Sequence, residues 1–548
     1  MTEETGGGDK LMAELIDLAT RRPKRKPRPS AERRDIGRPV IKLEASERER
    51  VVDNVELLLI GSELGRQRGL YQRAGQVVSV QRVKAIAAGD KAITVAAIVE
   101  RGDHALLEDI SATVAFVKFD KRANDWVLCD APMWIVKTLK DRKGALRFPV
   151  LAGVIHAPAM RADGSVLTEL GYDPSTGLLF DPLGVEFPVV PDLPTRADAV
   201  DALAELAYVI KEFPFVTTAH RAVALSGLLT SVCRRSLATA PLHAYSAPIR
   251  GSGKSKLVDV ASVIATGLEA PVTSAGATDE ELEKRLVASL LAGVSIVTLD
   301  NCSRAIGGDL LCQMLTQPTV RLRPLGKSDA VTCPAGAFVA ATGNNFVAAG
   351  DMERRTIVCK LDPKTATPET RVFDFEPVAL AKERRAGLVV AALTVLRAYH
   401  VAGRPGRPDP LGSFEDWSNL VRGALIWLGE ADPVDTMAEV READPETGAL
   451  RQVMTAWSAE FGREHVTVSR VIKKALEQGR ETVDGPLVFV NEDLRDALLV
   501  VAPGAGGINS RILGRWLGKF KDRVLDGLRF EERGVRDGAA VWALAQVA

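Results

Sequence analysis

The chain has 548 residues, of which 46% are hydrophobic and 26% charged, and its 71 basic and 71 acidic residues leave a net charge of zero. This length suggests several domains, and the composition is that of a globular protein with enough apolar material for a core. A balanced charge excludes a protein that is basic throughout, so any nucleic-acid-binding surface has to be local.

Targeting signals and metal-binding cysteines are not evident in the sequence. The first residues, MTEETGGGDKLMAEL, lack the charged and then apolar order of a signal peptide. The apolar run LVASLLAGVSIVTL (286–299) is too short to span a membrane and contains Gly293. We therefore expect a cytoplasmic protein without membrane contact. The six cysteines form no Cys-x-x-Cys pair, which predicts reduced thiols and no structural zinc.

The N-terminal part divides into a basic arm and a folded domain. The segment RRPKRKPRPSAERR (21–34) combines basic residues with prolines, so residues 1–47 are predicted to form a disordered arm. The arm is either a solvated linker or a contact for phosphate backbones. Residues 48–195 contain the β-like runs QVVSVQRV, KAITVAAIV, ATVAFVKFD and DWVLCD, followed by Asp-Gly and Asp-Pro turns. They predict one α+β domain without a catalytic cluster.

Residues 196–375 predict an α/β domain with a helical lead-in over 197–239. Apolar runs then alternate regularly with helical periodicity. We expect strands over 242–248, 270–276, 294–301, 337–345 and 356–362, and helices over 254–267, 279–293 and 307–317. This alternation predicts an open, mainly parallel sheet, in which ligands bind at the carboxyl ends of the strands.

The stretch SAPIRGSGKSKL (246–257) matches most of a phosphate-binding loop. The pattern needs Gly, four free positions and then Gly-Lys-Ser/Thr, and Pro248 occupies the place of the first glycine. Lys254 is expected to reach the β- and γ-phosphates of ATP, and the Ser255 hydroxyl to hold Mg²⁺. The alternative interpretation is a glycine-rich turn that caps a helix. The candidate nucleotide-binding residues are Arg250, Gly251, Ser252, Gly253, Lys254, Ser255 and Lys256.

The strand VSIVTLDN (294–301) ends in an acid, as a Walker B strand does. Asp300 is a candidate ligand of the Mg²⁺ shell. Many ATPases of this class have a glutamate base next, but this chain has Asn301, and an amide cannot take a proton from water at neutral pH. Glu281 is a candidate base, although the Thr-x-x-Glu pattern from Thr278 favours a capping box.

Two polar segments follow on the next strands. AFVAATGNN (337–345) ends in Asn344 and Asn345, one of which is expected to polarise the attacking water beside the γ-phosphate, unless the pair only forms a turn. GDMERRTIVCKLD (350–362) contains Arg354 and Arg355, one of which is expected to act across a subunit boundary on the transferred phosphoryl group. The alternative is a pair of surface arginines bound to nearby acids.

TVRLRPLGKSDAVTCPAG (319–336) predicts a β-hairpin whose tip is Gly-Lys-Ser-Asp. Arg321 and Arg323 lie on one face of its first arm, and Lys327 lies at the tip. Inside a ring of subunits these three side chains are expected to contact a DNA strand. The alternative is a solvated surface hairpin.

These motifs carry a resemblance over residues of about 200–380. PIRGSGKSK, VSIVTLDN, RLRPLGKSD, FVAATGNN and GDMERR resemble the AAA+ ATPase of superfamily 3-type helicases, as in phage and prophage primase-helicase proteins. GVIHAPAMRADGSVLTELGYDPSTGL resembles the segment that precedes the ATPase there. The resemblance implies a hexameric ring that translocates on single-stranded DNA with ATP and Mg²⁺. It carries over to Lys254, Ser255, Asp300, Asn344 or Asn345, Arg354 or Arg355, and Lys327. No paired acids of a primase are evident, so priming is expected from a separate protein.

The C-terminal part predicts a helical region over 376–465 and a winged-helix-like domain over 466–548. In the first, Trp417 and Trp427 are expected to be core residues. In the second, Ser510 is expected to cap a basic helix that precedes a strand-turn-strand wing. This helix contacts either DNA, single-stranded or duplex, or another protein. Its candidate DNA-binding residues are Arg511, Arg515 and Lys519, and Lys521 is the next cation along the same predicted helix.

The leading functional hypothesis is an ATP-driven DNA helicase of a phage-like replication system. The alternative is a DNA-binding initiator or regulator in which ATP only switches assembly, and Asn301 keeps this alternative open. A motor that acts on protein has no support, because no aromatic substrate-threading loop is evident. Both DNA hypotheses predict binding with a steep salt dependence.

Overall fold

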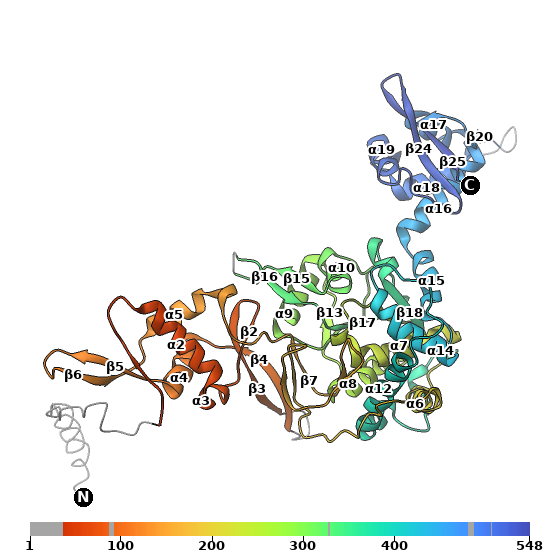
Figure 1. The fold of residues 1–548 in the computed structure, drawn as a ribbon. Helices are drawn as coiled ribbons and strands as arrows, with labels where there is room; N and C mark the ends of the chain where they lie inside the picture. The colour runs from red at the N-terminus through yellow and green to blue at the C-terminus, as the bar shows by residue number, and fades with distance from the viewer. Residues whose placement is uncertain (1–36, 87–91, 327–328, 481–486, 506, 548) are drawn as a thin grey trace, which may run out of the picture. The chain divides into compact units, whose positions relative to one another are not determined.

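The computed structural model describes residues 37–86, 92–326, 329–480, 487–505 and 507–547. The chain forms two compact units, Met1–Ala152 and Gly153–Ala548 (Figure 1). Among the described residues, the helices are all too short or too polar to cross a membrane.

The first unit contains two three-stranded sheets. One sheet has the order β1-β5-β6, with β1 parallel to β5, and the other is the antiparallel meander β2-β3-β4. The strands are β1 (Val40–Lys42), β2 (Leu70–Arg73), β3 (Gln76–Ile86), β4 (Ala92–Glu100), β5 (Ala115–Asp120) and β6 (Asp125–Cys129). The helices are α2 (Arg48–Gly61), α3 (Glu63–Arg66), α4 (Asp103–Thr113) and α5 (Met133–Asp141).

The core of the first unit lies between the β1-β5-β6 sheet and helices α2, α4 and α5. Ile41 and Phe116 are register partners and turn the same apolar face to these helices. The prediction of a disordered arm over residues 1–47 therefore does not hold for Val40–Lys42, because β1 is paired and contributes Ile41 to the core. The basic run 21–34 lies outside the described residues.

The segment after residue 152 belongs to the second unit, although the sequence groups it with the α+β domain. It contains β7 (Gly153–Ile155), β8 (Ala159–Met160), β9 (Val166–Leu167), β10 (Gly171–Asp173) and β11 (Leu178–Phe180). Ser295 donates to the Val154 carbonyl at 3.3 Å, and the Arg385 guanidinium donates to the His156 carbonyl at 2.7 Å. These bonds attach the segment to the sheet and helices that follow it.

A five-stranded parallel sheet forms the centre of the second unit and confirms the predicted mainly parallel sheet. Its order is β13-β14-β17-β12-β18. The strands are β12 (Leu242–Ala247), β13 (Val272–Ser274), β14 (Ile296–Asp300), β17 (Phe338–Asn344) and β18 (Thr356–Lys360). The connecting helices are α8 (Lys254–Thr266), α9 (Asp279–Ala292) and α10 (Asp309–Thr316), at the predicted places. The predicted hairpin is formed by β15 (Thr319–Leu322) and β16 (Val331–Pro334).

Helices from two distant parts of the sequence pack together beside this sheet. They are α6 (Arg196–Val209), α7 (Thr218–Cys233), α11 (Pro377–Glu383), α12 (Arg385–Val401), α13 (Glu415–Trp417), α14 (Gly423–Leu428) and α15 (Met437–Glu442). The indole N–H of Trp417 donates to the Thr230 hydroxyl at 2.9 Å, and Trp417 is fully buried, so it is a core residue as predicted. Trp427 lies against Tyr399, with 5.6 Å between the ring centroids.

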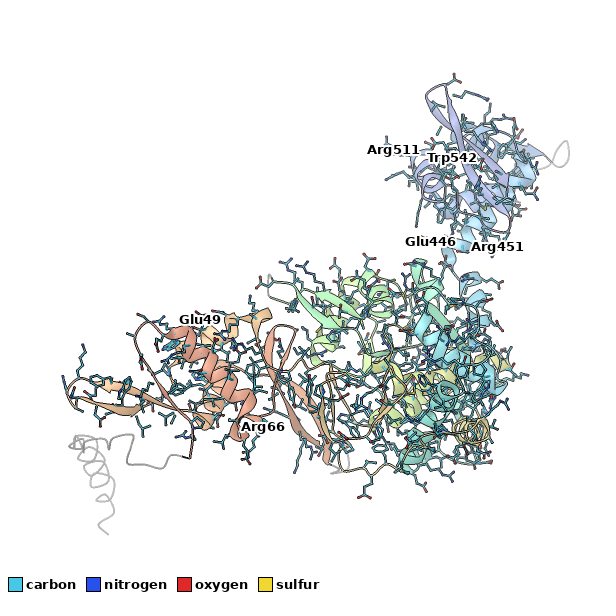
Figure 2. The ribbon with its side chains drawn as sticks, in the orientation of Figure 1. Glu49, Arg66, Glu446, Arg451, Arg511 and Trp542 are labelled. Carbon is cyan, nitrogen blue, oxygen red and sulfur yellow. The ribbon has the colours of Figure 1, made fainter. Side chains whose placement is uncertain are left out.

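The C-terminal core combines four helices with the three-stranded sheet β19-β25-β24. The elements are α16 (Pro445–Phe461), α17 (Val468–Ala475), α18 (Glu492–Val501), α19 (Ser510–Lys519), β19 (Val466–Thr467), β24 (Leu528–Arg536) and β25 (Ala539–Gln546). Leu450 and Trp457 of α16 belong to this core, which therefore begins before the predicted boundary at residue 466. Figure 2 shows Trp542 within this core and Arg511 at its outside.

The start and end of α19 differ from the sequence prediction. The prediction that Ser510 caps the helix is wrong, because Asn509 is the capping residue. The side-chain oxygen of Asn509 accepts the backbone N–H groups of Arg511 and Ile512 at 3.0 and 3.1 Å. Lys521 lies beyond the last residue of the helix, and its ammonium pairs with Glu532 at 3.0 Å. The basic face of α19 is therefore shorter than predicted.

Candidate functional site

Three adjacent strands end at the same edge of the central sheet, and each delivers one part of the candidate site. β17 lies between β12 and β14, and all three run parallel. The phosphate-loop sequence follows β12, Asp300 ends β14, and Asn344 ends β17 in register with Ala247. The sheet order thus brings together residues that are up to about 90 positions apart in sequence.

The loop after β12 turns at two glycines with positive φ angles. Gly251 and Gly253 have φ angles of +76° and +90°, which glycine adopts without a side-chain clash. A Cβ at Gly253 would lie 2.9 Å from the Phe213 ring, so this position also requires the absence of a side chain. The buried Ser252 hydroxyl donates to the Ile249 carbonyl at 2.8 Å and closes the turn. Helix α8 begins at Lys254, so its first N–H groups face the loop.

Lys254 is held at the sheet edge by two neutral oxygens. Its ammonium donates to the Ile249 carbonyl at 3.0 Å and to Asn344 Oδ1 at 2.9 Å. Burial lowers the pKa of Lys254 against the opposing effect of the Asp300 charge. A phosphate oxygen is a stronger acceptor than an amide or carbonyl, so this ammonium is poised for an anion.

Asp300 lies at the centre of a chain of oxygen groups. The Ser255 hydroxyl donates to Asp300 Oδ1 at 3.1 Å, and the Thr342 hydroxyl donates to the same oxygen at 2.5 Å. The Thr342 oxygen in turn accepts the backbone N–H of Asn301 at 2.9 Å. A serine hydroxyl and a carboxylate are ligands that Mg²⁺ prefers, so the residues present fit this ion.

The geometry distinguishes the two asparagines that the sequence left open. Asn344 contacts the Lys254 ammonium, whereas Asn345 is exposed, has a φ angle of +49°, and donates its backbone N–H to the Ala247 carbonyl. Thr342 was not singled out from the sequence. The sequence did contain a signal for Thr342. It lies two residues before Asn344, so the two side chains share one face of the strand, and the other residues of the strand are apolar or small.

The residues considered for the base do not form a water-activating group. Asn301 is exposed with a φ angle of +52°, a left-handed conformation that asparagine tolerates. Glu281 accepts the backbone N–H of Ala277 at 3.0 Å, and its own N–H donates to the Thr278 hydroxyl at 3.3 Å. Glu281 thus serves the start of α9, as the sequence favoured, but its carboxylate bonds to the N–H of Ala277 and not to that of Thr278, so the two bonds of a capping box are not both formed.

Arg354 and Arg355 both bind Asp351 and differ in exposure. The Arg355 side chain is 10% exposed and also donates to the Asp351 carbonyl at 2.8 Å, whereas the Arg354 side chain is 61% exposed. In the part of the chain that the structure describes, neither arginine bonds to Lys254 or Asp300 of the same chain.

The remaining candidate residues lie on exposed surfaces. Arg250 is exposed, and Lys256 pairs with Glu376 at 2.8 Å. Arg321 and Arg323 are exposed on the β15–β16 hairpin, next to Leu325, which is 86% exposed, while Lys327 lies outside the described residues.

On α19, Arg511 and Arg515 are exposed, and Lys519 pairs with Glu446 at 2.6 Å. Two of the three cations predicted to contact DNA from this helix therefore point to solvent, and the third is partly neutralised by α16.

Comparisons with known proteins give distant similarities. No protein-family model and no curated protein matches this chain. A solved structure described as the apo C-terminal region of NrS-1 is 14% identical, covers 69% of this chain and 87% of its own, and has a TM-score of 0.31. An SCCmec type IV Cch helicase is 11% identical, with 87% and 97% covered and a TM-score of 0.31. A JCV helicase is 12% identical, with 46% and 74% covered and a TM-score of 0.20.

Proposed function

We propose that this chain is an ATP-driven DNA helicase of a phage or mobile-element replication system, with an AAA+ core of the superfamily 3 type. The observation that carries the proposal is the bonded set at the carboxyl edge of the central sheet. Lys254 bonds to Asn344, and Ser255 and Thr342 both bond to Asp300. A phosphate loop, an acid at the end of a strand and a polar sensor on the strand between them are the parts that ATP hydrolysis requires.

The cofactors of the proposed reaction are ATP and Mg²⁺. Backbone N–H groups of the loop and the Lys254 ammonium would bind the phosphates, and Ser255 and Asp300 would hold the ion, which would supply positive charge beside the phosphates. Lys254 donates to Asn344 Oδ1. If a phosphate oxygen replaced this amide as the acceptor of the ammonium, the Asn344 side chain would be free to orient the attacking water.

The proposed active form is a homo-hexameric ring on single-stranded DNA. Arg354 is the better arginine for a neighbouring subunit's nucleotide, because its guanidinium is exposed whereas that of Arg355 is buried. The hairpin residues Arg321, Arg323 and Lys327 would contact the strand in the ring.

The C-terminal core is proposed to be a winged helix, with α19 as its recognition helix and β24–β25 as its wing. Exposed Arg511 and Arg515 would contact DNA phosphates. Primer synthesis is assigned to a separate protein.

The test is ATP hydrolysis with and without single-stranded DNA. We expect stimulation by DNA that is abolished in Lys254→Ala and in Lys327→Ala. Lys284→Ala is the matched control, because Lys284 is an exposed lysine on α9 without a role in the site. A purified protein that remains a single protomer with ATP and DNA, and that binds no adenine nucleotide, would refute the proposal.

The alternative function is a DNA-binding initiator or regulator that ATP switches without turnover. The observation that favours it is Asn301, which leaves the position after Asp300 without a group that can accept a proton. Nucleotide-dependent binding of duplex DNA in the absence of hydrolysis would support this alternative over the helicase.

A further inference from the structure

One face of the β1-β5-β6 sheet is separate from the helical core of the first unit. Successive side chains of a strand point to opposite faces, and Ile41 and Phe116 turn to helices α2, α4 and α5. Lys42, Phe119 and Trp126 therefore share the opposite face, and Phe119 is the register partner of Trp126. We call these three residues the aromatic face. In Figure 1 the β5–β6 hairpin that carries its two rings extends beyond the helices of this unit.

The aromatic face exposes rings that usually lie in a core. Phe119 is 47% exposed and Trp126 is half-buried, and their ring centroids lie 5.7 Å apart in an edge-to-face arrangement. The Lys42 ammonium lies 5.0 Å from the centroid of the Trp126 ring. The packing of one ring on the other fixes their orientation, so the exposed ring surface is presented in a defined geometry.

The cations at this face are not neutralised by acids of the described chain. The turn between β5 and β6 adds Lys121 and Arg122, both exposed. Among the described residues, neither these two nor Lys42 forms an ion pair. The two acids beside the turn bond to its backbone: Asp120 Oδ1 accepts the N–H of Arg122 at 2.8 Å, and Asp125 Oδ1 accepts that of Trp126 at 2.8 Å.

The sequence adds further positive charge next to this face. The run 21–34 holds eight Lys or Arg and one Glu, and it ends six residues before Val40 opens β1. Six residues of chain span at most about 20 Å, so the chain links the end of this run to β1 by no more than that length. Exposed rings combined with these cations fit a ligand that carries both flat bases and phosphates.

We propose that the aromatic face binds single-stranded DNA, with bases stacked on Phe119 and Trp126 and phosphates held by Lys42, Lys121 and Arg122. Duplex DNA does not suit this surface, because its bases are already stacked on one another and offer no ring face. The site lies in the first unit and requires no nucleotide, so it does not depend on the proposed ATPase.

The first test measures the affinity of fluorescein-labelled oligo-dT of about 20 nucleotides by anisotropy, without nucleotide and in the Lys254→Ala background. We expect Phe119→Ser and Trp126→Ser each to weaken binding by about 5- to 150-fold, the range for removing the stacking partner of one base. Val83→Ser is the matched control, because Val83 is 46% exposed on β3 of the same unit. Its affinity should equal that of the parent.

The second test separates charge from folding. Lys121→Gln/Arg122→Gln should reduce the slope of log affinity against log salt by about 0.7 for each phosphate that is no longer neutralised, with an unchanged thermal unfolding curve. Photo-crosslinking with 5-iodouracil DNA should place adducts on Phe119 or Trp126. Four results would each overturn the proposal. Two of them are an unchanged DNA affinity in both ring variants and crosslinked adducts confined to other segments. The other two are tighter binding of oligo-rU than of oligo-dT, and ring variants that lose self-association but keep DNA binding. A failure of the proposed helicase would appear instead as absent ATP hydrolysis with these binding results intact.

Discussion

Thr342→Val is the substitution that tests the geometry of the proposed metal site most directly. Thr342 is 1% exposed, and valine is also β-branched and of similar size, so the change replaces the hydroxyl with a methyl group. The hydroxyl donates to Asp300 at 2.5 Å and accepts the Asn301 N–H at 2.9 Å, so the substitution removes both bonds together. A hydrogen bond to a charged group contributes about 1.5–3 kcal/mol, and a partner group around a metal ligand typically changes metal affinity or activity by about 10- to 100-fold.

The assay is steady-state ATP hydrolysis as a function of Mg²⁺ concentration, with Thr342→Ser as the conservative rescue. We expect the Mg²⁺ concentration for half-maximal rate to rise by about 10- to 100-fold in Thr342→Val and to return toward the wild-type value in Thr342→Ser. Thr298→Val is the control, because Thr298 is a buried threonine on the adjacent β14 whose hydroxyl has no hydrogen-bond partner among the described residues. A wild-type Mg²⁺ dependence in Thr342→Val, or an equal change in Thr298→Val, would refute the reasoning.

Three further predictions concern stability and the arginine segment. Asn509 supplies the cap of α19, so Asn509→Ala should lower the unfolding free energy of the C-terminal core by about 1 kcal/mol in a urea titration. Ser510→Ala should change this free energy by less than about 0.5 kcal/mol. Burial raises the pKa of Glu353 to about 7, and the carboxyl of Asp444 beside it adds to this effect. The folded state therefore binds this proton more tightly than the unfolded state does. The free energy of unfolding consequently falls as the pH rises from about 4.5 through 7. Glu353→Gln should therefore melt higher than wild type at pH 8, and the difference should shrink toward pH 5 in calorimetry. Arg354→Ala should retain the wild-type melting temperature and lose about 10³-fold or more in ATPase rate, whereas Arg355→Ala should also melt lower, because its guanidinium is buried and bonded.

The parts of the fold that the sequence predicted are those encoded by local periodicity. The alternation of apolar strands and helices between residues 242 and 362 specifies the parallel sheet, and the glycine-rich loop lies where that alternation requires it. Strand β1 was missed because three residues carry no periodic signal, and its pairing with β5 joins segments more than 70 residues apart. The cap of α19 was misplaced by one residue, since Asn509 and Ser510 are both good capping residues and only the backbone distinguishes them.

The site shows the same division between local and non-local information. The residues from Gly251 to Ser255 and Asp300 follow from motif and strand ends, but the choice of Asn344 over Asn345 depends on strand register. The role of Thr342 depends on the adjacency of β14 and β17, which are separated by the helix α10 and the β15–β16 hairpin in sequence. No pattern within one strand predicts such a bond between strands.

β17 connects the groups that have to act together in the proposed reaction. Thr342 on this strand bonds to Asp300, the proposed metal ligand, and Asn344 at its end bonds to Lys254, the proposed phosphate ligand. Seven residues later in the chain, Asp351 holds the exposed Arg354. The strand is paired on both sides, and its two polar side chains are only two residues apart. In the proposed reaction, a phosphate that replaced Asn344 as the partner of Lys254 would therefore act on the strand that also holds Asp300. Because only seven residues separate Asn344 from Asp351, a shift of Asn344 would be passed along the chain to the segment that carries Arg354. In the proposed ring we therefore expect Arg354, and not the buried Arg355, to contact the nucleotide of the neighbouring subunit.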